Sequence, residues 1–385
     1  MHKTLLFACL CAVLAVAAVV AMMAMQVEDD SPSAIAAPID RAEHADTIEA
    51  MRSATRKRPV VALLALNQGT EVADFLSAFG MLRQADTADV VVVAQTSAPV
   101  RLYPGDLRVL PQATFDAFDR RHPDGADYVV VPAMEPHDDP VAARWLVAQY
   151  KSGARIASIC NGAQTLAAAG LLDGRRATSH WNTVQALRKQ HPTMQWVRNR
   201  RYVTDGTVTT STGVSASLPL MLALVEAMGG EQAAGRTARE LGIDHWDARH
   251  ATDAFQLTTA HKWTFLRNKL RVWARREVVV PVGPEVDEIA LGLAIDAWSR
   301  TELASIGSVA PAAQVRSKRG LVLLPGRVAK TGTPGSASTI VPPGEPGQAL
   351  DQVLERIRSE LDLRTARYVA LTLEYPWRPA DGASH

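Results

Sequence analysis

The sequence predicts an α/β fold: a flavodoxin-like parallel sheet with helices on both faces. Apolar strand-like runs alternate with helical patterns from residue 60 to residue 228, one run ends in a sharp turn at Cys160, and part of the pattern returns after about residue 275. With 385 residues, 47% of them hydrophobic and 21% charged, the chain is expected to be globular, with about two domains. Its net charge of +1 gives no reason to expect nucleic acid as a partner.

The predicted strands and helices follow one another in turn. The strand candidates are short apolar runs at residues 60–66, 90–94, 128–132, 155–159 and 208–211. Helical patterns lie at residues 75–84, 140–150, 163–171, 183–189 and 218–228. This alternation indicates a parallel sheet covered on both faces. Residues 100–110, around Pro104 and Gly105, are expected to form a hairpin-like side element.

The N-terminus is predicted to be a transmembrane helix that anchors the protein. Residues 5–25 carry no charge, and as a helix these 21 residues would be about 31 Å long, close to the thickness of a bilayer's hydrocarbon core. Lys3 precedes the segment and residues 28–30 are acidic, which places the main body on the non-cytoplasmic side, periplasmic or extracellular. A signal peptide cleaved near residues 34–37 is the alternative, although the apolar region is longer than is usual for such signals.

Cys160 is the candidate nucleophile of the chain. It stands between a predicted strand and a predicted helix, and the free N–H groups of a helix N-terminus favour a thiolate and bind an oxyanion, here through the amides of Asn161 and Gly162. Cys9 and Cys11 lie in the N-terminal apolar segment, so the rest of the chain has one thiol and no disulfide partner. The alternative is a buried, inert cysteine.

Two further residues are expected to reach the same place. Asp74 stands where a predicted strand gives way to a helix, and such turns gather at one edge of a parallel sheet, so Asp74 could exchange a proton with Cys160 or with substrate. The alternative for Asp74 is a helix N-cap. His180 follows Cys160 by twenty residues, is expected on the next short strand or its edge, and could orient substrate or assist proton transfer.

The motifs around these residues resemble those of the ThiJ/PfpI superfamily, a branch of the class I glutamine-amidotransferase-like fold. The resemblance covers roughly residues 57–242 and is carried by residues 158–163, 168–181 and 210–216. It is greatest for isonitrile hydratases and for the amidase-like N-terminal halves of AraC-type regulators. The resemblance implies that Cys160 is the elbow cysteine, that Asp74 takes the place of the family's acidic residue, and that His180 matches the histidine after the elbow.

The sequence also departs from this family. Members with peptidase-like or chaperone activity often carry Gly-Gly after the third strand, where Ala133 and Met134 stand here. Asn161 occupies the place of a histidine in PfpI-type peptidases and of a threonine in isonitrile hydratase-like members. The departures weaken a peptidase interpretation. The predicted oxyanion and substrate-binding residues are Ala133, Asn161, Gly162 and Trp181.

The C-terminal part is predicted to be a degenerate, partial second copy of the same half-fold. Residues 285–289 echo residues 71–75, which makes Glu288 the counterpart of Asp74, and the copy ends before any elbow cysteine. Packing, a lid or ligand binding are the roles expected of it; chance similarity of α/β units is the alternative. The predicted divisions are an anchor at 1–26, a tether at 27–56, a ThiJ/PfpI-like domain at 57–260, and a linker helix with the half-domain at 261–385.

Between the two copies, residues 261–276 are basic and aromatic, with apolar residues at nearly helical spacing: Trp263, Phe265, Leu266, Leu270 and Trp273. We expect an amphipathic helix that packs on the first domain; binding at a membrane surface is the alternative. His245 and His250 lack the spacing of a zinc site, so neither a metal nor another cofactor is expected.

Two functions remain open at this point. The first is a cysteine-dependent hydratase or hydrolase, amidase-like, that acts on a small molecule. The second is a non-catalytic module that binds a ligand in the same pocket or senses redox state through oxidation of Cys160. No helix-turn-helix follows the first domain, so DNA binding is not expected. The expected partners are a small-molecule substrate or ligand, the membrane through the N-terminal helix, and a second copy of the chain in a homodimer.

Overall fold

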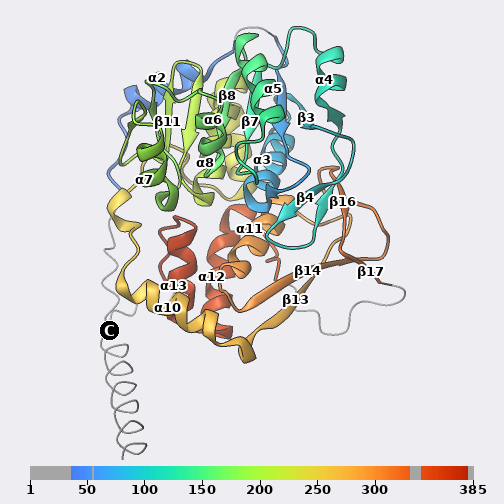
Figure 1. The fold of residues 1–385 in the computed structure, drawn as a ribbon, viewed down its shortest axis with the longest axis vertical. Helices are drawn as coiled ribbons and strands as arrows, with labels where there is room; N and C mark the ends of the chain where they lie inside the picture. The colour runs from blue at the N-terminus through green and yellow to red at the C-terminus, as the bar shows by residue number, and fades with distance from the viewer. Residues whose placement is uncertain (1–35, 54–55, 330–339, 380–385) are drawn as a thin grey trace, which may run out of the picture.

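The computed structural model describes residues 36–53, 56–329 and 340–379. At its centre is a seven-stranded sheet with the order β11-β12-β8-β7-β1-β3-β6 (Figure 1). All neighbouring strands are parallel except β11 and β12, which are antiparallel, so the sheet is mixed and not purely parallel. The strands are β1 (Val60–Leu64), β3 (Asp89–Ala94), β6 (Ala113–Thr114), β7 (Tyr128–Val131), β8 (Arg155–Ser158), β11 (Tyr202–Asp205) and β12 (Val208–Ser211).

Helices cover both faces of this sheet, as predicted. Val61 and Leu63 of β1 belong to one apolar core, and Val60 and Ala62 belong to the other, because successive side chains of a strand point to opposite faces. The first core includes α2 (Arg41–Met51), α3 (Val72–Ala85), α8 (Ser217–Gly229) and α9 (Glu231–Leu241). The second includes α4 (Phe115–Arg121), α5 (Pro140–Lys151), α6 (Gly162–Ala168) and α7 (Trp181–Gln190). The predicted α/β fold is confirmed.

A second α/β unit follows after residue 275. Its strands β13, β14 and β17 pair in parallel in that order, as β1, β3 and β6 do in the first unit. In each unit an antiparallel hairpin precedes the third strand: β4–β5 in the first and β15–β16 in the second. The elements are β4 (Val100–Tyr103), β5 (Arg108–Val109), β13 (Arg276–Pro281), α11 (Glu288–Ser299), β14 (Ala304–Ala310), β15 (Val315–Arg316), β16 (Val322–Leu324) and β17 (Arg327–Val328).

The two units are joined through α3 with α11 and through β5 with β16. The helices approach closely because each presents a glycine: a Cβ on Gly80 would lie 2.7 Å from Ile289, and one on Gly292 would lie 3.0 Å from Leu76. Strand β16 pairs with β5 in a five-stranded sheet, β15-β16-β5-β4-β2, in which β2 is Thr70–Glu71. Figure 1 shows α11 directly beneath α3.

The remaining elements complete the second unit and its connections. Helices α12 and α13 pack on each other and on α11, and α10 packs on α13. Their bounds, with those of the short elements, are α10 (Thr259–Leu270), α12 (Ala349–Glu360), α13 (Leu363–Thr372), β9 (Arg176–Ala177), β10 (Gln195–Trp196), and the 3₁₀ turns Val214–Ala216, Thr252–Ala254, Val272–Ala274 and Pro346–Gln348.

Several expectations for the flanking segments can now be compared with the structure. Residues 41–51 of the predicted tether form α2, which buries Ile48 and Met51 in the core. The predicted membrane segment, residues 5–25, lies outside the described residues, and none of the described helices is long and apolar enough to cross a bilayer. The expectation that residues 261–276 pack an apolar stripe on the first domain is wrong, because Leu270 and Trp273 are exposed.

Candidate active site

The predicted elbow is present and is centred on Cys160. Strand β8 ends at Ser158, Cys160 has the left-handed φ of +54° that is uncommon outside glycine, and α6 begins two residues later. The Cys160 amide donates to the carbonyl of Thr212, 3.1 Å away. The turn also needs Gly162, because a Cβ there would lie 2.2 Å from the carbonyl oxygen of Val131. The sequence therefore places the thiol in a tight turn at the carboxyl end of β8.

The thiol itself is closed off from solvent. Cys160 is 3% exposed, and it is the free cysteine of the described residues. Burial raises the pKa of the Cys160 thiol well above its ordinary value; the charge of Asp74 raises this pKa further, while Arg300 opposes the shift. The expected thiolate is therefore wrong for this arrangement, in which desolvation outweighs the helix N-terminus and leaves a neutral thiol.

Asp74 lies in the first turn of α3, fully buried. Its Oδ2 accepts a hydrogen bond of 3.0 Å from the amide of Ala133, and its Oδ1 has no partner among the described residues. Burial raises the pKa of Asp74 to about 7, against the hydrogen bond from Ala133, which lowers it. The capping role is filled by Glu71, whose carboxylate accepts the Asp74 amide at 2.6 Å. The carboxyl of Asp74 is thus available for proton transfer.

The second unit adds charged groups that the sequence analysis missed. Arg300, at the end of α11, is 2.8 Å from the carboxylate of Asp296 and donates to the carbonyl of Thr372 at 3.0 Å. Arg300 lowers the pKa of both Cys160 and Asp74, although in each case burial has the larger, opposite effect. The sequence does contain a sign of this pair. Asp296 is a single acidic residue among the apolar residues 289–298, so its carboxylate is expected to be buried, and Arg300 follows at the spacing of a helical ion pair.

Glu374, just beyond α13, closes the site from the same side. Its carboxylate accepts hydrogen bonds from the amides of Trp181, at 2.7 Å, and Gly213. Burial raises the pKa of Glu374 to about 7, against these two hydrogen bonds. One guanidinium, that of Arg300, therefore stands among four fully buried carboxyl groups, those of Glu71, Asp74, Asp296 and Glu374.

His180 is held in a different role from the predicted one. It caps α7, where its Nδ1 accepts the amide of Asn182 at 3.2 Å, and its Nε2 donates to the carbonyl of Thr372 at 2.9 Å. Burial, with the positive charge of Arg300, lowers the pKa of His180 to about 3. The ring is neutral at physiological pH and both nitrogens are occupied, so the structure does not support proton transfer by His180 in this arrangement.

Most of the amides predicted to bind an oxyanion already donate hydrogen bonds within the protein. The amide of Gly162 donates to Ile159 within the turn at 2.8 Å, and the amide of Ala133 donates to Asp74. Of the three predicted amides, that of Asn161 makes no hydrogen bond within the part of the chain that the structure describes. Trp181 holds the C-terminal segment in place, because its indole N–H donates to Leu371 at 3.1 Å.

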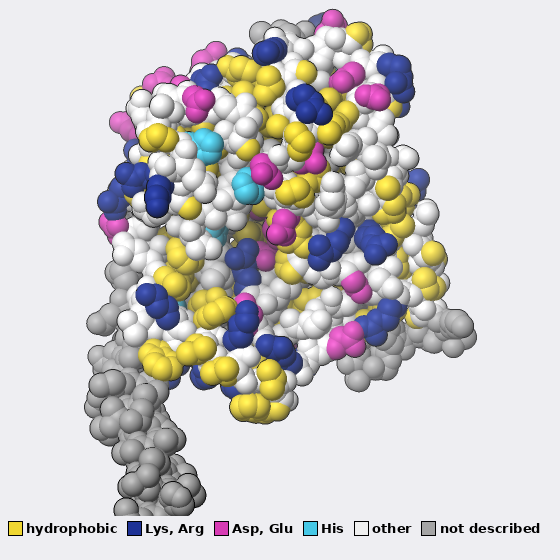
Figure 2. All heavy atoms as spheres, in the orientation of Figure 1, with side chains coloured by type: hydrophobic (Ala, Val, Ile, Leu, Met, Phe, Trp, Pro, Cys, Tyr) yellow, Lys and Arg dark blue, Asp and Glu magenta, His cyan; other side chains and the backbone are white. Residues whose placement is uncertain are grey.

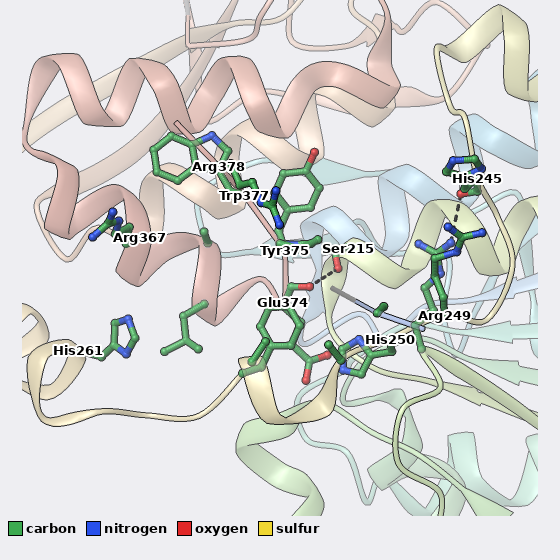
Figure 3. Close-up of a pocket in the computed structure, with 18 of the residues that line it drawn as sticks. Ser215, His245, Arg249, His250, His261, Arg367, Glu374, Tyr375, Trp377 and Arg378 are labelled. Carbon is green, nitrogen blue, oxygen red and sulfur yellow. Dashed lines mark hydrogen bonds between the residues drawn. The ribbon is translucent and has the colours of Figure 1, made fainter. Parts of the chain in front are cut away.

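A cavity of about 550 Å³ lies on the outer side of Glu374 (Figure 3). The side chain of Ser215 donates to the Glu374 carbonyl at 2.7 Å along its wall. Cys160, Asp74 and His180 do not line it. Its lining is instead basic and aromatic, with Arg201, Arg249, His250, Arg367, Trp377 and Arg378. The volume is in the range of small-molecule sites.

The sequence is similar to those of several known proteins. The DJ-1/PfpI family model matches residues 60–227. The isonitrile hydratase of Pseudomonas putida is 30% identical over 162 residues, which are 41% of this chain and 67% of that protein. The regulator CdhR of Pseudomonas aeruginosa is 33% identical over 122 residues, 32% of this chain and 36% of that protein, and GlxA of Rhizobium meliloti is 41% identical over 86 residues, 22% of this chain and 26% of that protein.

The chain thus spans only about a third of the length of these regulators. Among solved structures, Drosophila melanogaster DJ-1beta superposes with a TM-score of 0.44 and 22% identity, over 49% of this chain and 100% of that one.

The burial of the thiol makes a prediction about its reactivity. Iodoacetamide should alkylate Cys160 slowly in the folded protein, at a rate that still rises above the ordinary pKa of a thiol. Asp74→Asn should move this pH profile to lower pH, because the Asp74 charge raises the thiol pKa. The measurement is the modified fraction of the Cys160 peptide by mass spectrometry across a pH series.

Asp116→Asn, an exposed carboxyl in α4, is the control and should leave the profile unchanged. Fast alkylation of the unmodified protein at neutral pH would contradict the closed arrangement.

Proposed function

Because the chain belongs to the DJ-1/PfpI family, we propose that it is a cysteine-dependent hydratase or hydrolase that acts on a small neutral molecule. One observation carries this proposal: the buried carboxyl of Asp74 has a pKa of about 7, and its charge acts on the thiol of the Cys160 elbow. One oxygen of this carboxyl has no hydrogen-bond partner among the residues that the structure describes. A general base works best when its pKa lies near the working pH. The similarity to isonitrile hydratase supports hydration as the reaction.

The chemistry needs only these two residues and water. With an isonitrile, the sulfur of Cys160 adds to the terminal carbon as Asp74 takes the thiol proton and passes it to that carbon, which gives a thioimidate. Water then adds to the carbon–nitrogen double bond, with Asp74 as the base. Collapse of this adduct releases the formamide and returns the proton to sulfur. Each turn of the cycle adds one water molecule and changes no oxidation state of the protein.

The second unit supports this chemistry without a nucleophile of its own. We propose that it is a truncated copy of the first unit, in which Glu288 takes the place of Asp74. Glu288 is fully buried and is paired with Arg319 at 2.8 Å, so its carboxylate is neutralised locally. The positive charge of Arg300, in the same unit, lowers the pKa of the Cys160 thiol and would stabilise negative charge that develops on sulfur.

Activity with a small isonitrile tests the proposal. Cys160→Ser should abolish hydration, and Asp74→Asn should lower kcat by about 10²–10⁴-fold, the range for loss of a general acid–base group. The readout is formamide production by the full chain. Glu288→Gln is the matched control: it alters the corresponding buried carboxyl of the second unit and should leave kcat per folded molecule unchanged. Turnover that survives in Cys160→Ser would sink the mechanism.

A ligand-binding, regulatory role is the second candidate, and the cavity beside Glu374 is the observation that favours it. CdhR and GlxA, to which part of this chain is similar, are transcriptional regulators. Redox sensing gains no support, because oxidation of a cysteine follows thiolate character and exposure, and Cys160 has neither.

The basic and aromatic lining predicts that this cavity binds an aromatic anion. By calorimetry, 2-naphthoate should bind more tightly than the uncharged 2-naphthamide. Arg367→Gln should weaken naphthoate binding about tenfold, which corresponds to roughly 1.4 kcal/mol. Arg364→Gln is the control, since Arg364 lies on the same helix but does not line the cavity. Equal affinity for the two probes, or equal effects of the two variants, would rule out an anion site.

We also propose that residues 5–25 anchor the protein, with its main body on the non-cytoplasmic side. The length of the uncharged segment and the acidic residues after it support this orientation. Protease added to spheroplasts should digest the body, whereas inside-out vesicles should protect it. Recovery of a mature chain that begins near Ala37 would show cleavage instead.

A further inference from the structure

Most large apolar side chains of α10 and of the turn after it face solvent; Phe265 is the exception, since it packs against the core beside Tyr368. Their exposed fractions are 36% for Trp263, 42% for Leu266, 62% for Leu270, 60% for Val272 and 79% for Trp273. The residues that α10 buries are polar: His261, Thr264 and Asn268. An amphipathic helix on a soluble domain normally shows the reverse arrangement. A group of exposed apolar side chains of this size marks a surface that contacts something else.

Basic residues accompany these apolar side chains. Figure 2 shows hydrophobic side chains gathered at the end of the molecule that α10 forms, with Lys and Arg beside them. From Thr258 to Arg276 the chain has no acidic residue, and its basic residues are Lys262, Arg267, Lys269, Arg271, Arg275 and Arg276. Tryptophan and leucine flanked by lysine and arginine are typical of helices that lie in a membrane interface.

We propose that α10 and residues 271–273 form a contact surface for anionic phospholipid, which we call the α10 surface. Trp273, Leu270 and Leu266 would enter the region between headgroups and acyl chains.

Three of the basic residues form ion pairs within the protein: Arg267 with Asp362, Lys269 with Glu302 and Arg276 with Glu360. Lys262, Arg271 and Arg275 would therefore pair with the lipid phosphates. A second copy of the chain fits less well, because two such surfaces would bring like charges together. The surface lies apart from Cys160 and needs no catalytic activity.

The length of the N-terminal segment is consistent with this contact. Ala36, the first described residue, lines the same cavity as His261 at the start of α10. The uncharged segment ends at Met25, and the ten residues from 26 to 35 span at most about 36 Å when extended. A bilayer entered by that segment is therefore within reach of the α10 surface.

Tryptophan quenching tests the proposal with the full chain. The protein is reconstituted into vesicles of phosphatidylcholine and phosphatidylglycerol whose acyl chains carry bromine, which quenches tryptophan on contact. Trp273→Phe should remove about half of the quenchable emission, since Trp263 and Trp273 are the two tryptophans of the surface. Trp196→Phe, in β10 of the first unit, is the control and should leave quenching unchanged.

A second pair of variants separates lipid contact from a change in folding. Leu270→Glu should reduce the quenching of Trp273, and Val328→Glu, at another exposed apolar position, on β17, should not. Quenching that is the same in Trp273→Phe as in the unmodified protein would overturn the proposal. So would a concentration-dependent blue shift of Trp273 without lipid, which would assign the surface to a second copy of the chain.

Discussion

The ion pair between Asp296 and Arg300 places a positive charge near the candidate active site, and the pKa values of the groups there depend on it. Asp296 is buried and the Arg300 side chain is 23% exposed, and Arg300 is the one guanidinium among the four carboxyls of the described site. Removing Arg300 would leave the buried carboxylate of Asp296 without a compensating charge, which destabilises a folded protein. Through this pair the second unit affects the chemistry of the first. The charge of Arg300 lowers the pKa values of Cys160, Asp74 and His180, and its position depends on the packing of α11 against α3.

Burial raises the pKa of all four carboxyls, to about 7 for Asp74 and Glu374, while Arg300 lowers these pKa values. This follows from desolvation, which disfavours the charged form of each carboxyl. Asp74 and Glu374 can therefore accept or release protons near neutral pH inside the protein. Such an interior suits a reaction that moves protons between a thiol, a neutral substrate and water. A charged substrate would have to lose its hydration in the same space, at a cost the site has little means to offset.

The sequence predicted the first unit well because each of its signals is local. Val60–Leu64 and Tyr128–Val131 are apolar runs of strand length, and the residues around Cys160 encode their own turn. It offered burial of the thiol as an alternative only, since Arg300 and Glu374, whose charges act on the thiol, are far from Cys160 in the sequence. The same reason explains the error on α10: periodicity located the helix and its apolar stripe, but the direction in which the stripe points depends on tertiary contacts.

Strand pairing between β5 and β16 has a consequence for assembly. Val109 pairs with Leu323, and the two residues hold matching places in two units of like topology. The contact has the character of a dimer interface, yet both halves belong to one chain. A noncovalent dimer would separate on dilution, whereas the linkage here fixes the effective concentration of the second half. The groups that depend on this contact, Arg300 among them, are therefore present in every folded molecule at any expression level.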